Sequence, residues 1–222
     1  MLSRRLDSNT RLQPSLRSKA VNDLEPQTLV QAQRGDAQAF AQLVEAYQRP
    51  VYNLCYRMLG DPYEAEDAAQ ETFLRAYDHL KRYDAQRSFS TWLLSIAAHH
   101  CIDQTRKRRF PLLSLDDDEA PYLEPPDAGP GPETLLGQHE DQKKVQLLLG
   151  SLNSQDRAVV VMFYWYEMSY EEIAEGLKMT VSAVKSRLHR ARLALAKTWT
   201  VQEAHVLPSE RTQNDKAHSP AF

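Results

Sequence analysis

The residues best suited to a chemical task lie near the C-terminus, on a polar face that repeats at helical spacing. This face carries hydroxyl and cationic side chains: Ser182, Lys185, Ser186, Arg187, His189 and Arg190. Short hydroxyl side chains let a helix approach base edges, and Lys and Arg contact phosphates or guanine. The face therefore indicates a helix that enters the major groove of DNA, with a surface helix that binds nothing as the alternative.

The segments around this face have the signals needed to position it. Ser169 can cap a short helix whose first turn holds Glu171 and Glu172, and Thr180 can cap the next helix. Apolar residues then recur at three- and four-residue spacing: Ile173, Ala174, Leu177, Val181, Val184, Leu188, Ala191 and Leu195. With a turn at 178–180, the pattern predicts a helix-turn-helix over 169–195.

A second candidate surface is the acidic face of a helix predicted over 62–80, capped by Asp61 and opened by Pro62. Its buried stripe holds mainly small residues: Ala65, Ala68, Ala69, Thr72, Phe73, Ala76 and Tyr77. The other face carries Glu64, Glu66, Asp67 and Glu71. Carboxylates can ligate metal or transfer protons, but no convergent His, Gly-rich loop or nucleophile motif accompanies them. We expect a solvated face or a docking surface, and no enzyme, cofactor, metal site or small-molecule substrate.

A third segment combines aromatic residues with cations. After a loop at 84–87, Ser88 to Thr91 can cap a helix whose buried stripe includes Phe89 and Trp92, and which ends in the cluster Arg106-Lys107-Arg108-Arg109. Neighbouring His99, His100 and Cys101 point in different directions on a helix, so ordinary helix positions are favoured over a metal site. The chain's two cysteines, Cys55 and Cys101, give no disulfide or zinc pattern.

Charge and proline content divide the chain. The net charge is −3, but 177–202 and 106–109 are basic, and 113–141 is acidic without Lys or Arg. Six prolines within 111–132 predict an extended linker between helical domains at 26–110 and 133–200. The fold class expected is all-α, with no membrane-spanning segment. Residues 1–25 are read as a disordered basic arm rather than a transit peptide, and 201–222 as a disordered tail.

These motifs, in this order, resemble the extracytoplasmic-function (ECF) group of bacterial sigma factors. SYEEIAEGLKMTVSAVKSRLHRARLAL, at 169–195, is similar to their region 4; DPYEAEDAAQETFLRAY, at 61–77, is similar to region 2.2; and 89–109 is similar to regions 2.3 and 2.4. The resemblance implies a cytoplasmic, non-catalytic subunit of RNA polymerase that directs transcription initiation. The partners that it implies are the polymerase core (β and β′ subunits), promoter DNA and an anti-sigma protein.

The resemblance also implies site residues. Core polymerase would be bound by Glu66, Asp67, Gln70, Glu71 and Phe73. The melted −10 strand would be bound by Tyr83, Arg87, Phe89, Trp92, Arg106, Lys107 and Arg109. The −35 duplex would be read by Ser182, Lys185, Ser186, Arg187 and Arg190. A helix-turn-helix regulator that binds duplex DNA by itself is the main alternative, although it would not need the motifs at 61–109 and would usually dimerise.

The chain departs from the family pattern at two positions. Family members usually carry glycine where Lys178 stands, whereas here Gly176 lies two residues earlier, and Ser182 replaces a common glycine. If Lys178 takes a left-handed conformation, the lysine costs about 1 kcal/mol. The change at Ser182 bears on the −35 sequence preference.

Overall fold

The computed structural model describes residues 27–84, 87–109 and 133–206, and every regular element in these ranges is helical. A short helical segment at 27–33 precedes the labelled helices. Their bounds are α2 Ala37–Leu59, α3 Pro62–His79, η1 Leu80–Arg82, α4 Phe89–Arg109, α5 Glu133–Gly150, α6 Ser154–Tyr166, α7 Tyr170–Gly176 and α8 Val181–Val206. The predicted all-α class is confirmed for these residues. The arm, the linker and the end of the tail lie outside the described residues.

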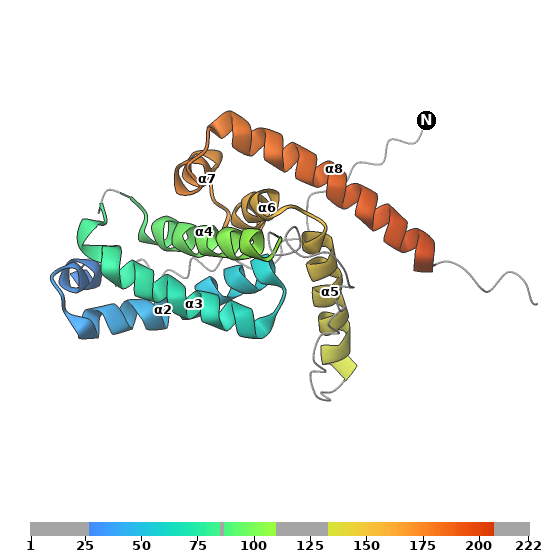
Figure 1. Ribbon diagram of the computed structural model, residues 1–222. Helices are drawn as coiled ribbons and strands as arrows, with labels where there is room; N and C mark the ends of the chain where they lie inside the picture. Colours follow the sequence, from blue (N-terminus) through green and yellow to red (C-terminus); the bar gives the residue numbers. More distant parts are fainter. Residues whose placement is uncertain (1–26, 85–86, 110–132, 207–222) are drawn as a thin grey trace, which may run out of the picture.

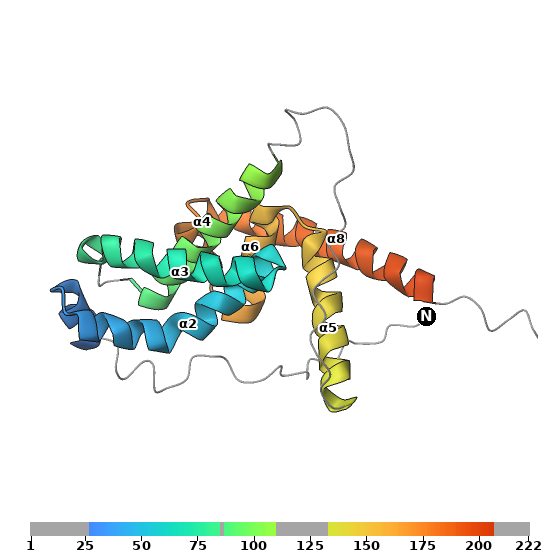
Figure 2. The ribbon, with the colours of Figure 1, turned by 60° about the horizontal axis from the view of Figure 1, so that its bottom comes forward.

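Helices α2, α3 and α4 form the N-terminal domain, in which each helix packs against the other two (Figures 1 and 2). Asp61 caps α3 by accepting a hydrogen bond from the Glu64 amide at 2.9 Å, and Pro62 opens the helix, as predicted. The small residues of α3 are buried, with Ala65, Ala68 and Ala76 fully covered. The prediction was wrong for Tyr77, which is 50% exposed because it lies at the edge of the stripe, with its ring against Phe40. Small side chains let α3 pack closely against α2 and α4. This packing holds the helix that carries the acidic face.

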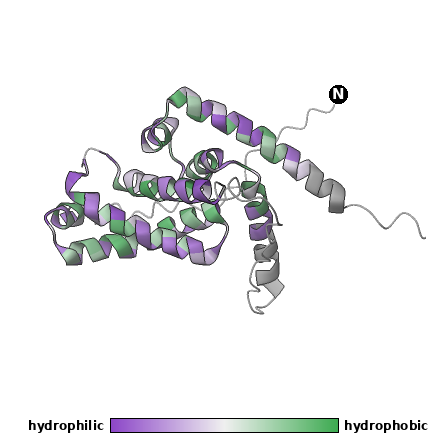
Figure 3. Ribbon diagram, in the orientation of Figure 1, coloured by the Kyte–Doolittle hydropathy of each residue, from purple (hydrophilic) through white to green (hydrophobic). Residues whose placement is uncertain are grey.

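Helices α5 to α8 form the C-terminal domain, which lies against α2 and α4 rather than apart from them. Figure 1 shows α6 beside α4, α7 above it and α8 crossing the top, while Figures 1 and 2 both show α5 and the end of α8 projecting away. The core of α6 holds Val159, Val161 and Met162, all fully buried. Figure 3 shows apolar and polar residues interspersed along α2 and along the coloured part of α8.

Hydrogen bonds and a cation–π contact connect the two domains. The Tyr166 hydroxyl of α6 donates to the Pro50 carbonyl of α2 at 2.6 Å, and Gln146 of α5 donates to the Tyr56 carbonyl at 3.0 Å. The Arg57 guanidinium lies 5.1 Å from the centre of the Trp165 ring. Burial in this contact lowers the pKa of Arg57 and raises the pKa of Tyr166. The composition of the chain predicted two domains, but it gave no sign that they touch.

Candidate nucleic-acid interface

The helix-turn-helix is built by the caps that the sequence predicts. The Ser169 hydroxyl accepts from the Glu172 amide at 3.2 Å, and the Glu172 carboxylate accepts from the Ser169 amide at 2.8 Å, so the two residues form a reciprocal capping box. Thr180 caps α8 by accepting from the Ala183 amide at 3.1 Å. Between them, Lys178 has a φ of +53°, which is the left-handed conformation considered for this position. The turn is therefore formed with a lysine, rather than a glycine, in the left-handed conformation.

The recognition face of α8, defined as Ser182, Lys185, Ser186 and Arg190, is exposed to solvent. The opposite face is anchored by Val184, Leu188 and Ala191, each at most 1% exposed. A shallow concavity runs over this part of α8, lined by Ala183, Lys185, Ser186, Arg187, His189 and Arg190. In the part of the chain that the structure describes, neither Lys185 nor Arg190 has an acidic partner. Their charges are therefore free to meet phosphates or bases.

Arg187 differs from Lys185 and Arg190, because it forms an ion pair within the protein. Its guanidinium donates to the Asp156 carboxylate at 2.6 Å and also to the Gln155 side chain, both on α6. The two charged side chains of this pair are 23% and 10% exposed. In this conformation Arg187 braces α8 against α6.

Lys185 makes a contact with an aromatic ring that the sequence analysis did not predict. The Lys185 ammonium lies 5.4 Å from the centre of the Tyr170 ring, which contributes a cation–π contact. Tyr170 itself stacks on Phe163 of α6, with ring centres 5.3 Å apart. Tyr170 thus links Lys185 of α8 to Phe163 of α6.

The aromatic residues of the third segment form a cluster at the start of α4. The Tyr83 ring is 4.9 Å from Trp92 and 5.6 Å from Phe89, and Phe89 also meets Tyr47 at 5.3 Å. Tyr83 and Phe89 are only 6% and 4% exposed, so neither can present a ring face to a base in this conformation. Trp92 is partly exposed. The Tyr83 hydroxyl donates to the Arg87 carbonyl.

The cations of this segment lie at its two ends. Arg87 is exposed and pairs with Glu175 of α7 at 3.0 Å. Arg106 and Lys107 are exposed near the end of α4, where Arg106 also pairs with Asp103 at 3.3 Å. The neighbouring Arg108 pairs with Glu64 of α3. The side chain of Arg109 lies outside the described residues.

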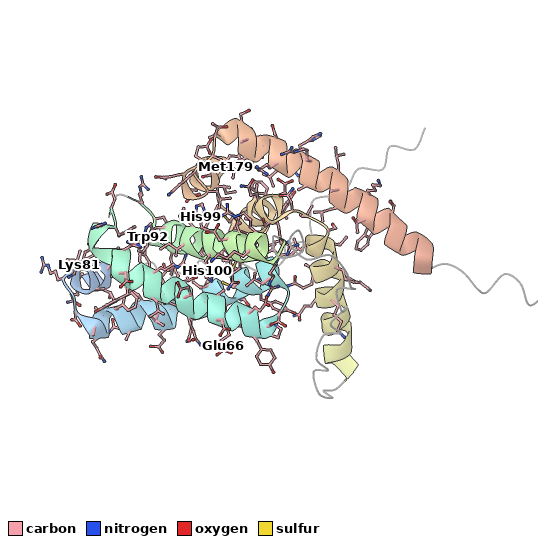
Figure 4. The ribbon with its side chains drawn as sticks, in the orientation of Figure 1. Glu66, Lys81, Trp92, His99, His100 and Met179 are labelled. Carbon is pink, nitrogen blue, oxygen red and sulfur yellow. The ribbon has the colours of Figure 1, made fainter. Side chains whose placement is uncertain are left out.

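The acidic face of α3 is defined as Glu66, Asp67, Gln70 and Glu71. The first three are exposed, and Glu71 is held by Arg75 at 2.7 Å, which lowers the pKa of the glutamate. Phe73 is partly buried on the neighbouring side of the helix. Figure 4 shows Glu66 on the part of α3 far from α7 and α8, so this surface is separate from the recognition face.

The comparisons with known proteins match both domains. The Sigma-70 region 2 family matches residues 43–110, and the Sigma-70 region 4 family matches 142–195. The ECF RNA polymerase sigma factor SigW of Bacillus subtilis is 41% identical over 75% of this chain and 92% of its own length. The RNA polymerase sigma-H factor of Pseudomonas aeruginosa is 32% identical over 78% of this chain and 92% of its own.

The chain belongs to the ECF sigma factors of the sigma-70 family. A solved structure of CnrH in complex with the cytosolic domain of CnrY is also similar, with 27% identity and a TM-score of 0.59 over 81% of this chain and 99% of that one. The sigma factor directs promoter recognition by RNA polymerase, binding the polymerase and promoter DNA, and is not itself an enzyme. None of the described helices is long and apolar enough to cross a membrane.

Proposed function

We propose that the recognition face of α8 reads the −35 element as duplex DNA. The observation that carries this proposal is the exposed, uncompensated charge of Lys185 and Arg190 beside the hydroxyls of Ser182 and Ser186. Hydroxyls at the start of the helix permit close approach to base edges, and the cations bind phosphate or guanine. Arg187 supports this reader by bracing α8 on Asp156, and it reaches DNA only if that pair opens.

The start and the end of α4 serve the melted −10 strand in this proposal. Trp92 supplies the stacking surface, and Arg87, Arg106, Lys107 and Arg109 bind the backbone, because a separated strand offers both flat bases and closely spaced phosphates. Tyr83 and Phe89 hold Trp92 in place from within the core. Single-strand binding depends on the polymerase to open the duplex, so the protein alone should bind duplex DNA weakly.

The acidic face of α3, together with Phe73, is proposed to bind the clamp of the β′ subunit. Exposure of Glu66, Asp67 and Gln70 on a rigid, well-packed helix is what such a docking surface requires. The domains at 26–110 and 133–200 would then act as separate functional units on polymerase, with the acidic linker 111–132 crossing the polymerase cleft. We also propose a cytoplasmic location, and regulation by an anti-sigma protein bound as the cytosolic domain of CnrY is bound to CnrH.

Run-off transcription with purified core polymerase on a promoter library tests whether the protein recognises −10 and −35 elements as part of the polymerase. The parent should initiate from promoters that share −10 and −35 elements, and it should not footprint duplex DNA at nanomolar concentration without core. Specific footprinting by the protein alone would favour a regulator that acts without polymerase.

Charge reversal tests the docking surface. Glu66→Lys with Asp67→Lys should weaken core binding by about 2–5 kcal/mol, since like charges would meet at the interface. The matched control is Glu45→Lys with Asp78→Lys, which makes the same charge change at exposed positions elsewhere on this domain. Both variants should melt as the parent does. Equal core affinity for the two double variants would mean that the acidic face is only solvated.

A further inference from the structure

Three cations that the functions proposed above do not use lie together at one end of the N-terminal domain. This basic tip is defined as Arg34, Lys81 and Arg82, and all three side chains are exposed. Among the described residues, none of the three has an acidic side chain within ion-pair distance. Figure 4 shows Lys81 at the end of the domain, pointing away from the rest of the molecule. A cluster of cations of this kind attracts a polyanion.

The short helix η1 places Lys81 and Arg82 in solvent. The residues on either side, Leu80 and Tyr83, are only 1% and 6% exposed. The Tyr83 amide donates to the Leu80 carbonyl at 3.1 Å, which closes a single tight turn. Residues three apart in such a turn lie on the same side, so burial of Leu80 and Tyr83 leaves the two residues between them on the solvent side. The core therefore fixes where these two cations lie.

Arg34 joins the basic tip through the helical segment at 27–33. The Gln33 side chain donates to the Leu80 carbonyl at 3.2 Å and to the Tyr83 carbonyl at 2.9 Å. These two carbonyls flank η1, so the end of the segment is fixed against it. Gly35, with a φ of +95°, lets the chain turn directly after Arg34. The match to the Sigma-70 region 2 family begins at residue 43, so Arg34 lies outside it.

Most of the acidic groups near the basic tip are engaged elsewhere. The Asp36 carboxylate caps α2 by accepting from the Gln38 amide at 2.8 Å and the Ala39 amide at 3.2 Å. Asp84 lies 4.0 Å from the Arg87 guanidinium. Asp78, in the last turn of α3, is exposed but forms no ion pair with the described cations. The basic tip therefore keeps a net positive charge.

The basic tip continues the surface proposed to bind the −10 strand. Arg82 directly precedes Tyr83, and the loop that follows leads to Arg87 and the start of α4. The end of α4 leads instead into the linker toward the domain proposed to read the −35 element, so this end faces upstream. A strand that passes along α4 from its end to its start then reaches the basic tip with the nucleotides that follow the −10 element. This step rests on the proposed function of α4.

We propose that the basic tip binds the phosphates of the separated DNA strand between the −10 element and the transcription start. The ligand is the backbone of single-stranded DNA of any sequence, because Lys and Arg contacts to phosphate carry no sequence information. Three further cations lengthen the strand interface beyond the −10 element. A strand that they hold is less free to pair again with its complement.

The experiment uses polymerase assembled with the full-length sigma factor and two labelled fork probes. In both, the −35 element is duplex and the −10 element is a single strand; the short probe ends with the −10 element, and the long probe continues for about six unpaired nucleotides. Fluorescence anisotropy at several salt concentrations measures binding. Lys81→Ala with Arg82→Ala should shrink the gain in affinity that the extension gives. The salt slope on the long probe should fall by about 1.4 units, since each phosphate contact of a single strand contributes about 0.7.

The same double variant should bind the short probe as the parent does. The matched control, Arg49→Ala with Lys143→Ala, removes two exposed cations elsewhere and should bind both probes normally. A thermal melt checks that each variant is folded. A third probe, whose extension is paired with its complement, tests the choice of ligand, and on this probe the basic-tip variant should match the parent.

An unchanged gain from the unpaired extension in the basic-tip variant would overturn the proposal. Equal losses on the short and the long probe would also overturn it, because they would place the basic tip on the −10 element or on polymerase. An equal loss on the paired extension would mean that the ligand is duplex DNA. Failure of the −10 assignment is a different result: Arg87→Ala and Trp92→Ala would then bind the short probe as tightly as the parent.

Discussion

The two regions that we propose to read DNA, on α8 and at the start of α4, differ in how far their side chains are exposed. The recognition face of α8 is exposed, and among the described residues its two cations have no acidic partner. The apolar side of the helix is buried against α6 and α7. At the start of α4, two of three aromatic residues are buried and the loop cation is held by a carboxylate from the other domain. A duplex has a fixed shape that a rigid helix can meet, whereas a melted strand exists only after polymerase has opened the DNA. The proposed −35 reader is therefore a preformed surface, whereas most of the aromatic side chains of the proposed −10 reader are packed within the protein.

The largest expected effect concerns the aromatic cluster. Phe89→Ala should lower the free energy of unfolding by about 3–5 kcal/mol, because the ring is buried among Tyr47, Tyr83 and Trp92. Chemical denaturation measures the change. Arg87→Ala, at an exposed position of the same segment, should leave stability nearly unchanged. A Phe89 variant that is as stable as the parent but fails to open promoters would show that this ring is a reader and not a support.

The next effect concerns how α8 is braced. Asp156→Asn should lower the free energy of unfolding by about 2–3 kcal/mol, because it leaves the partly buried Arg187 without its countercharge. Glu71→Gln, which breaks the more exposed pair with Arg75, should leave the melting temperature nearly unchanged. If the two variants melt alike, Arg187 is not a brace and its charge is available to DNA.

Smaller changes are expected on the recognition face itself. Lys185→Ala and Arg190→Ala should weaken −35-dependent transcription while sparing the fold, since both side chains are exposed. A lost base contact would cost about 1–3 kcal/mol at one position, and a lost phosphate contact would reduce the salt slope by about one unit. Transcription from promoter variants at several salt concentrations separates the two. Normal activity of both variants would place the −35 reader on another face.

Most of the local structure follows from short-range chemistry in the sequence. Asp61, Ser169 and Thr180 cap the helices that they were predicted to cap, because a cap depends only on residues three positions away. The buried small residues of α3 and the buried residues Ile173, Val184 and Leu188 of α7 and α8 follow from apolar spacing in the same way, although Tyr77 of the predicted α3 stripe is exposed.

The contacts between domains could not be predicted, because the residues that make them follow no periodic pattern in the sequence. His99, Tyr166 and Gln146 bind backbone carbonyls of distant helices, and any polar side chain can do so. In the sequence, Gly176 stands two residues before the position where the family usually carries glycine. The structure shows that the absence of a side chain at Gly176 lets α7 pack closely against Ser95 of α4. For Tyr83 and Phe89, the same aromatic pattern fits a core and a base-stacking surface, and only burial separates the two readings.

The smallest expected effect concerns the turn of the helix-turn-helix and tests whether Lys178 strains its backbone. Lys178 holds the turn of the helix-turn-helix at a φ of +53°, where a side chain with a Cβ is strained and glycine is not. Lys178→Gly should therefore raise the free energy of unfolding by up to about 1 kcal/mol, partly offset by the greater freedom of glycine in the unfolded chain. Lys178→Ala is the matched control, because it removes the same charge and keeps the Cβ. The measurement is the melting temperature of both variants beside the parent. Stabilisation by glycine alone would show that lysine strains the turn, whereas equal stabilisation by alanine and glycine would assign the effect to charge.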